Sequence, residues 1–255
     1  MTRCVVMIHG MWAGPWCWAG YRALFEAAGW RCLVPPLPCH DSDTRDAPDS
    51  RLGRLSLLDY ADALAAQITA VGERPIVIGH SMGGLLAQML AARSLARAAV
   101  LLAPAAPAGV WAVGPSVVRS FWGILTTWAF WCKPVRQTFD AASYSLLHRL
   151  PPEKRRQVYG SFGPESGRVV FEIGLWLLDA RHAARVDAEK VDCPMLVVGG
   201  REDRMTPVWA LRRVARRYRA RYREYEHHAH WLIGEPGWQD IAGEVLAWMN
   251  AQVPE

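Results

Sequence analysis

The feature that most constrains the fold is a serine flanked by glycines, placed between an apolar run and a helical pattern. The hexapeptide 79–84 reads Gly-His-Ser-Met-Gly-Gly and follows the β-rich run 75–78 directly. A strand-to-helix turn this tight strains the serine backbone, so the residues two before and two after it must be nearly free of side chain. Gly79 and Gly83 meet that need. The sequence therefore predicts that Ser81 projects above the end of a sheet, at the N-terminus of a helix.

Strands and helices alternate along most of the chain, which predicts an α/β fold with a mainly parallel sheet. We expect strands at 4–8, 31–34, 75–78, 98–102, 195–198 and 221–226. Helices are expected at 16–29, 57–71, 85–92, 207–219 and 237–251. From about 104 to 186 the alternation fails and helical, tryptophan-rich stretches take over. That break predicts a core made of 1–108 and 188–255, with a mostly helical cap inserted at 109–187.

Two later segments supply candidate partners for Ser81. Glu202 and Asp203 come just past a predicted strand, and a cluster of histidines at 227, 228 and 230 comes after the next one. The chain order is serine, acid, histidine, which differs from the order in chymotrypsin and in subtilisin.

The sequence resembles the α/β-hydrolase superfamily over essentially its whole length, most weakly from about 109 to 187. The resemblance rests on His-Gly-x-Trp at 9–12, Gly-His-Ser-Met-Gly-Gly at 79–84, Gly-x-x-Asp at 200–203 and His-Trp at 230–231. These motifs together are similar to those of small serine esterases and lipases. The resemblance implies the α/β-hydrolase fold, with a parallel sheet flanked by helices, and a Ser-His-Asp triad.

The resemblance also assigns the triad. Ser81 is the expected nucleophile, and Asp203 is favoured over Glu202 because the family places its acid last in Gly-x-x-Asp. His230 is favoured as the base because an aromatic residue and a short acidic loop follow it, with His228 as the reserve.

The oxyanion hole is expected to consist of two backbone N–H groups. One belongs to Met82, the residue after the nucleophile. By resemblance the other belongs to Met11, in the loop after the first strand.

The expected reaction is hydrolysis of carboxylic esters with an apolar acyl or alcohol portion, through an acyl-enzyme and with no cofactor or metal. A thioesterase, lactonase, acyltransferase or hydroxynitrile-lyase-like enzyme with the same triad remains open, because one fold hosts many reactions. A ligand-binding or signalling protein with very slow turnover also remains open.

Aromatic residues mark the predicted cap and its surroundings. Trp122 and Trp128 lie in the cap, while Trp12 and Trp231 lie in the loops expected near Ser81. We expect these four to be candidates for substrate contact. The alternative is that the cap aromatics only pack the cap onto the core.

Charge and cysteine content bear on whether the chain binds nucleic acid, metal or membrane. The net charge is +5, and arginines crowd residues 212–223, but no nucleic-acid-binding motif accompanies them. The six cysteines include no Cys-x-x-Cys pair, so neither a zinc site nor a redox motif is indicated. We expect no transmembrane segment, although peripheral membrane contact remains open. Met1-Thr2-Arg3 leads into the first strand without a signal peptide, which predicts a cytoplasmic protein.

Overall fold

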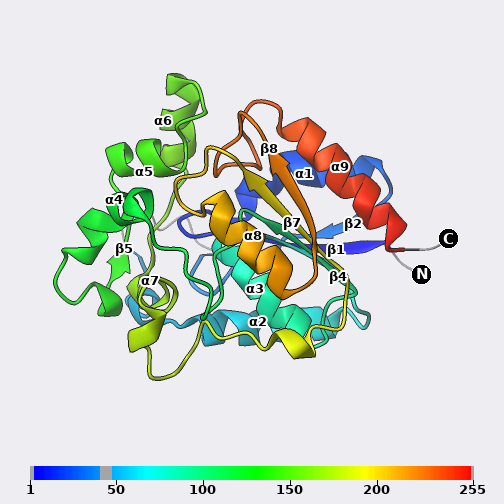
Figure 1. Cartoon of the computed structure of the whole chain (residues 1–255), viewed down its shortest axis with the longest axis horizontal. Helices are drawn as coiled ribbons and strands as arrows, with labels where there is room; N and C mark the ends of the chain where they lie inside the picture. Colours follow the sequence, from blue (N-terminus) through cyan, green and yellow to red (C-terminus); the bar gives the residue numbers. More distant parts are fainter. Residues whose placement is uncertain (1–2, 41–47, 254–255) are drawn as a thin grey trace.

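A six-stranded parallel sheet forms the centre of the computed structural model, which describes residues 3–40 and 48–253 (Figure 1). Its strand order is β2-β1-β3-β4-β7-β8. The strands are β1 Cys4–Ile8, β2 Arg31–Leu33, β3 Ile76–His80, β4 Ala98–Leu102, β7 Met195–Gly200 and β8 Arg221–Tyr225. Because neighbouring strands run parallel, their carboxyl ends meet at one edge of the sheet.

Burial follows the sequence of each strand. Every residue of β1, β3, β4 and β7 is buried, as expected for nearly continuous apolar runs covered on both faces. The outermost strand β8 alternates arginine with tyrosine and glutamate, and its residues are exposed or half-buried. The core of the molecule therefore lies around the four central strands.

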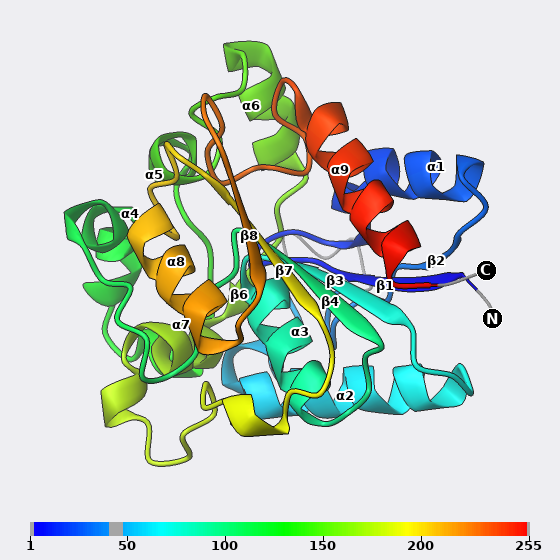
Figure 2. The same ribbon diagram turned by 45° about the vertical axis from the view of Figure 1, so that its right-hand side comes forward.

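Helices cover both faces of this sheet (Figures 1 and 2). Helices α1 Ala19–Ala27 and α9 Trp238–Ala251 lie on one face, and α2 Leu57–Ala70 and α3 Met82–Ala92 lie on the other. Helix α8 Val208–Arg217 packs beside β7, where Leu211 Cδ1 would lie 2.6 Å from a Cβ at Gly199. A capping box of Ser56 and Asp59 fixes the start of α2.

The chain between β4 and β7 adds four more helices at the carboxyl ends of the central strands, opposite the two termini (Figure 1). These helices are α4 Pro115–Leu125, α5 Phe139–Ser145, α6 Pro152–Gly160 and α7 Gly167–Gly174. A two-stranded antiparallel pair joins β5 Pro134–Val135 to β6 Glu165–Ser166. The division into a core of 1–108 and 188–255 and a cap of 109–187 stays a prediction. Residues 1–2, 41–47 and 254–255 of these ranges lie outside the described residues.

The ends of several elements differ from the sequence prediction. The helix predicted at 16–29 begins as a 3₁₀ turn, η1 Pro15–Trp18, before α1 follows. The helix predicted at 85–92 begins at Met82, because Ser81 itself is its N-cap. Within the described ranges, no helix combines the length and the apolar character that crossing a bilayer requires.

Candidate active site

Ser81 lies in a strained turn between β3 and α3. Its φ of 55° and ψ of −119° are values that residues with side chains rarely adopt. A Cβ at Gly79 would lie 2.0 Å from the Gly83 carbonyl oxygen, and a Cβ at Gly83 would lie 2.2 Å from the Ile8 carbonyl oxygen. The turn therefore requires glycine at both positions.

The loop that follows β1 packs directly against this turn. A Cβ at Gly10 would lie 2.9 Å from the Cβ of Ser81. The sheet order reverses between β1 and β3, and α/β sheets bind ligands outside such a reversal, at the carboxyl ends of the strands. Met82 is the first residue of α3, so its N–H is one of the N-terminal groups that lack a partner within the helix. Met11, Ser81 and Met82 line one cavity.

Asp203 and His230 form a buried pair. His230 Nδ1 lies 2.8 Å from Asp203 Oδ2, and neither side chain is exposed. The backbone N–H groups of Met205 and Thr206 donate to Asp203 Oδ1, and the Thr206 hydroxyl donates to Oδ2 at 2.7 Å. Burial alone would raise the pKa of Asp203, but the His230 ring and the hydrogen bonds from Thr206 hold the pKa below its ordinary value of 3.8. The carboxylate is therefore ionised at neutral pH.

The ionised carboxylate fixes the state of the imidazole. A carboxylate only accepts hydrogen bonds, so His230 Nδ1 carries the hydrogen and, in the neutral ring, Nε2 is the acceptor. His230 Nε2 is buried and has no hydrogen-bond partner among the described residues. A buried imidazole nitrogen with a free lone pair is suited to take up a proton.

The other two histidines of this segment have other neighbours. His227 is largely exposed, with Nδ1 3.8 Å from Glu202 Oε1. The Nδ1 atom of His228 lies 3.4 Å from Glu235 Oε1. Of the three, His230 is the one that pairs with Asp203.

Two further residues support the pair, and Thr206 is the one that was not predicted from the sequence. His80 Nε2 donates to the carbonyl oxygen of His230 at 2.8 Å, and its ring lies edge-on to Trp231. Thr206 donates to Asp203 from both its backbone and its side chain. The spacing Asp-x-x-Thr at 203–206 is a signal for such a side-chain-capped turn.

The cavity that contains Ser81 has a volume of about 410 Å³ and mostly apolar walls. One wall comes from the chain leading into α4 and from α4 itself, including Val110, Trp111, Val117, Phe121 and Leu125. A second set of lining residues comes from α7 and the 3₁₀ turn η4 Trp176–Leu178, including Val170, Ile173, Trp176, Leu177 and Leu178.

The four tryptophans predicted as substrate contacts lie elsewhere. Trp12 is buried and donates from Nε1 to the Val135 carbonyl oxygen, and Trp231 is buried beside His80. Trp122 and Trp128 are 62% and 82% exposed. None of the four is among the residues that line this cavity. Substrate contact by these tryptophans stays a prediction, and the cavity itself presents Trp111, Phe121 and Trp176.

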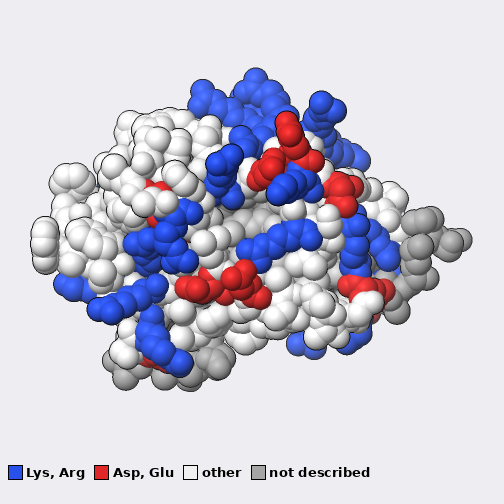
Figure 3. Space-filling view, turned by 90° about the horizontal axis from the view of Figure 1, so that it is seen from below, with Lys and Arg blue, Asp and Glu red and all other residues white. Residues whose placement is uncertain are grey.

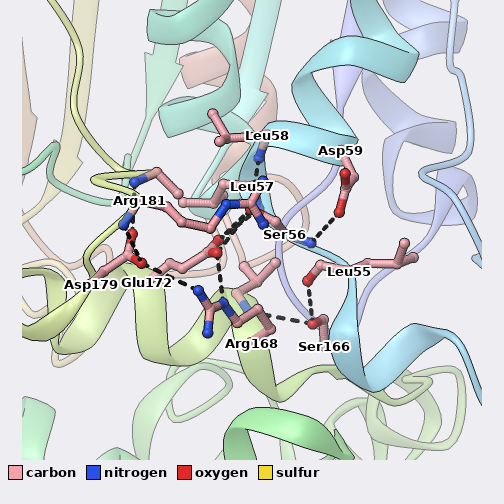
Figure 4. A network of polar contacts seen from close by, with 12 residues as sticks. Leu55, Ser56, Leu57, Leu58, Asp59, Ser166, Arg168, Glu172, Asp179 and Arg181 are labelled. Carbon is pink, nitrogen blue, oxygen red and sulfur yellow. Dashed lines mark hydrogen bonds and ion pairs between the residues drawn. The ribbon is translucent and has the colours of Figure 1, made fainter.

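A buried polar network holds the α7 wall in place (Figure 4). Glu172 on α7 accepts hydrogen bonds from the Ser56 hydroxyl and the Leu57 N–H, both at 2.8 Å. Arg168 donates to Glu172 at 2.9 Å and to Asp179 at 3.3 Å. The Glu172 carboxylate thus meets the N-terminus of α2, where a negative charge is stabilised.

Across 3–40 and 48–253, no group of three or more His, Cys, Asp or Glu residues is placed to hold a metal ion.

Known proteins share this fold. Residues 5–242 match the model of the alpha/beta hydrolase family. The chain is 32% identical over 87 residues to Methylesterase 8 of Arabidopsis thaliana, covering 33% of this chain and 30% of that protein. It is 37% identical over 109 residues to a probable esterase of Oryza sativa subsp. indica, covering 40% and 39%. The match thus spans well under half the length of these relatives.

Solved structures resemble the chain over nearly its full length. A methylesterase from Arabidopsis has a TM-score of 0.71 at 14% identity, covering 97% of this chain and 98% of that one. A pyrethroid hydrolase from Sphingobium faniae has a TM-score of 0.73 at 15% identity, covering 98% of both chains. These structures share the fold, and because the family model matches residues 5–242, the chain belongs to the alpha/beta hydrolase family.

Proposed function

We propose that this protein is a serine hydrolase that cleaves carboxylic esters with an apolar acyl or alcohol portion. The observation that carries the proposal is the buried contact between His230 and Asp203, which leaves His230 Nε2 as an unpartnered acceptor. Ser81 supplies the nucleophile, because its strained turn exposes it to the cavity.

The chemistry follows from these groups. His230 Nε2 takes the proton of the Ser81 hydroxyl as the oxygen attacks the ester carbonyl carbon. The backbone N–H groups of Met11 and Met82 stabilise the oxyanion. His230 then gives the proton to the leaving alcohol, which departs from the acyl-enzyme. A water activated by His230 releases the acid and restores Ser81.

The role of Asp203 is to orient and stabilise His230. Its carboxylate fixes the imidazole tautomer and stabilises the imidazolium that forms in each step. The hydrogen bonds from Met205 and Thr206 keep the carboxylate ionised and in place.

The substrate class is supported by the walls of the cavity. Apolar side chains from α4 and α7 favour apolar groups and give little compensation to a desolvated charge. The matched relatives carry the names esterase and methylesterase, which favours esters over thioesters and lactones as substrates.

We further propose that residues 109–187 act as a cap over a core of 1–108 and 188–255. The support is that residues within 110–125 and 170–178 supply most of the walls of the cavity that contains Ser81. Exchange of 109–187 should therefore change the preferred ester without removing the reactivity of Ser81.

Labelling with a fluorophosphonate tests the nucleophile, because this probe reacts with an activated serine whatever the substrate. We expect one label per chain at Ser81 and no label in Ser81→Ala. A panel of esters, thioesters and lactones then tests the substrate class. A preference for thioesters or lactones would overturn the ester assignment, and one product equivalent without steady turnover would indicate a binding protein.

A further inference from the structure

A patch of large exposed apolar side chains is formed by residues that line the cavity and by two tryptophans near Leu125 in the sequence. We call it the exposed apolar patch, and it consists of Trp111, Trp122, Leu125, Trp128, Leu177 and Leu178. Trp128 is 82% exposed and Leu178 is 71% exposed. Exposed apolar side chains normally occur singly, whereas a contiguous group of them marks a contact surface.

The patch is continuous with the cavity that contains Ser81. Trp111, Leu125, Leu177 and Leu178 each line that cavity while remaining exposed. Trp122 lies three residues before Leu125 on α4, so the two share one side of the helix. Whatever covers the patch therefore covers the entrance to Ser81.

Basic residues border the patch, and the exposed acids nearest to it along the chain are Asp140 and Asp187. No aspartate or glutamate occurs between residues 74 and 139, and Glu172 and Asp179 are buried. Arg119 and Lys133 are exposed, and Lys133 Nζ donates to the carbonyl oxygen of Trp128 at 2.9 Å. On the face shown in Figure 3, uncharged surface covers most of the end that carries α4, with basic side chains along its margins.

We propose that the exposed apolar patch docks on an anionic lipid surface. Tryptophan favours the boundary between lipid and water, and lysine and arginine beside it are attracted to anionic headgroups. A second copy of the chain fits less well, because a two-fold contact through this patch would bring the basic margins of both copies together. Docking would place the cavity entrance against the lipid that dissolves apolar esters, and this consequence rests on the proposed function.

Flotation of the Ser81→Ala protein with vesicles tests docking without turnover. We expect binding to phosphatidylcholine vesicles that contain phosphatidylglycerol and weaker binding to phosphatidylcholine alone. High salt should lower the first to the level of the second, because it screens the attraction between the basic side chains and the anionic headgroups. In the Ser81→Ala background, Lys133→Gln should weaken binding about fivefold. The matched control Lys190→Gln, an exposed lysine on η5 Ala188–Lys190 against α3, should leave binding unchanged.

The double variant Trp122→Ala, Trp128→Ala tests the apolar part. Both side chains are exposed and lie outside the cavity walls, so the melting temperature should be kept while vesicle binding falls at least about tenfold. Equal binding to neutral and anionic vesicles, or equal binding by the double variant, would overturn the proposal. A wild-type dimer that this variant dissociates would show that a second copy covers the patch. If the Ser81→Ala protein docks but wild-type Ser81 resists the fluorophosphonate, the proposed function fails and the docking stands.

Discussion

His80 Nε2 lies 2.8 Å from the backbone carbonyl oxygen of His230, so the residue before the candidate nucleophile holds the backbone of the candidate base. A carbonyl oxygen only accepts, so His80 donates this bond from Nε2. Burial, aided by the nearby His230 ring, lowers the pKa of His80 to about 3. His80 is therefore neutral at the pH where an esterase would work, and its support of His230 does not depend on titration.

The depressed pKa of His80 predicts a loss of stability in mild acid. Below pH 6.5 the unfolded chain takes up a proton on this side chain, whereas the folded protein does so only near pH 3. The free energy of unfolding should therefore decrease as the pH is lowered from 6.5 towards 3. For this group the decrease is at most about 1.4 kcal/mol per pH unit. His80→Gln, which keeps a donor but does not titrate, should flatten the slope between these pH values. Urea unfolding as a function of pH measures it, and an unchanged slope would contradict the assignment.

The contacts of Asp203 predict that it, and not Glu202, orients the base. Asp203→Asn should lower kcat by roughly four orders of magnitude, because the amide no longer holds the imidazole tautomer. The neighbouring Glu202 is exposed and its carboxylate lies 3.6 Å from Arg149. Glu202→Gln is therefore the matched control and should keep near-wild-type kcat for a p-nitrophenyl ester. A large loss of kcat in Glu202→Gln, together with a small loss in Asp203→Asn, would assign the role to Glu202 instead.

The hydrogen bonds of Glu172 predict that this residue affects both the stability of the fold and the substrate preference. Glu172→Gln removes the negative charge that accepts hydrogen bonds from Arg168 and from the N-terminus of α2. The substitution should lower the free energy of unfolding by about 1–3 kcal/mol. Because α7 also carries Val170 and Ile173 on the cavity wall, kcat/KM for medium-chain esters should fall more than for acetate esters.

The control for Glu172→Gln is Glu153→Gln. Glu153 is an exposed acid in the first turn of α6, so its loss should change neither quantity appreciably. If Glu172→Gln lowers kcat/KM equally for all chain lengths, Glu172 does not affect substrate preference through the α7 wall.

The apolar cavity predicts that longer acyl chains react better. Each Å² of apolar substrate surface removed from water contributes about 25 cal/mol, so kcat/KM should rise from acetate to medium-chain p-nitrophenyl esters. Free carboxylates near the scissile bond should be poorly tolerated. Steady-state kinetics on a chain-length series measures this, and a series led by acetate, or activity confined to small acidic esters, would contradict it.

The fold was predictable because its signals are local. Gly79, Ser81 and Gly83 lie within one turn, and the apolar runs of β1, β3, β4 and β7 are long enough to indicate buried strands. The pair β5 and β6 was missed, since strands of two residues carry no period. The exact start of α1 was missed because the 3₁₀ turn Pro15–Trp18 is only four residues long, too short to show a period that differs from that of the helix after it.

The candidate site was predictable where family motifs mark it and not where long-range contacts build it. The pairing of Asp203 with His230 follows the predicted chain order. The role of Glu172 could not be predicted from the sequence, because its partners Ser56 and Leu57 lie more than a hundred residues earlier. The walls of the cavity likewise depend on how residues of α4 and α7 come together, which composition alone does not specify.

The most direct test of the catalytic assignment compares two neighbouring histidines. The quantity to measure is the rate at which a fluorophosphonate labels Ser81 in His230→Ala and in His228→Ala, with circular dichroism to confirm that both variants fold. We expect that labelling is nearly abolished in His230→Ala, because Ser81 loses its base, and persists in His228→Ala. Persistent labelling in His230→Ala together with its loss in His228→Ala would show that His228, and not His230, is the base.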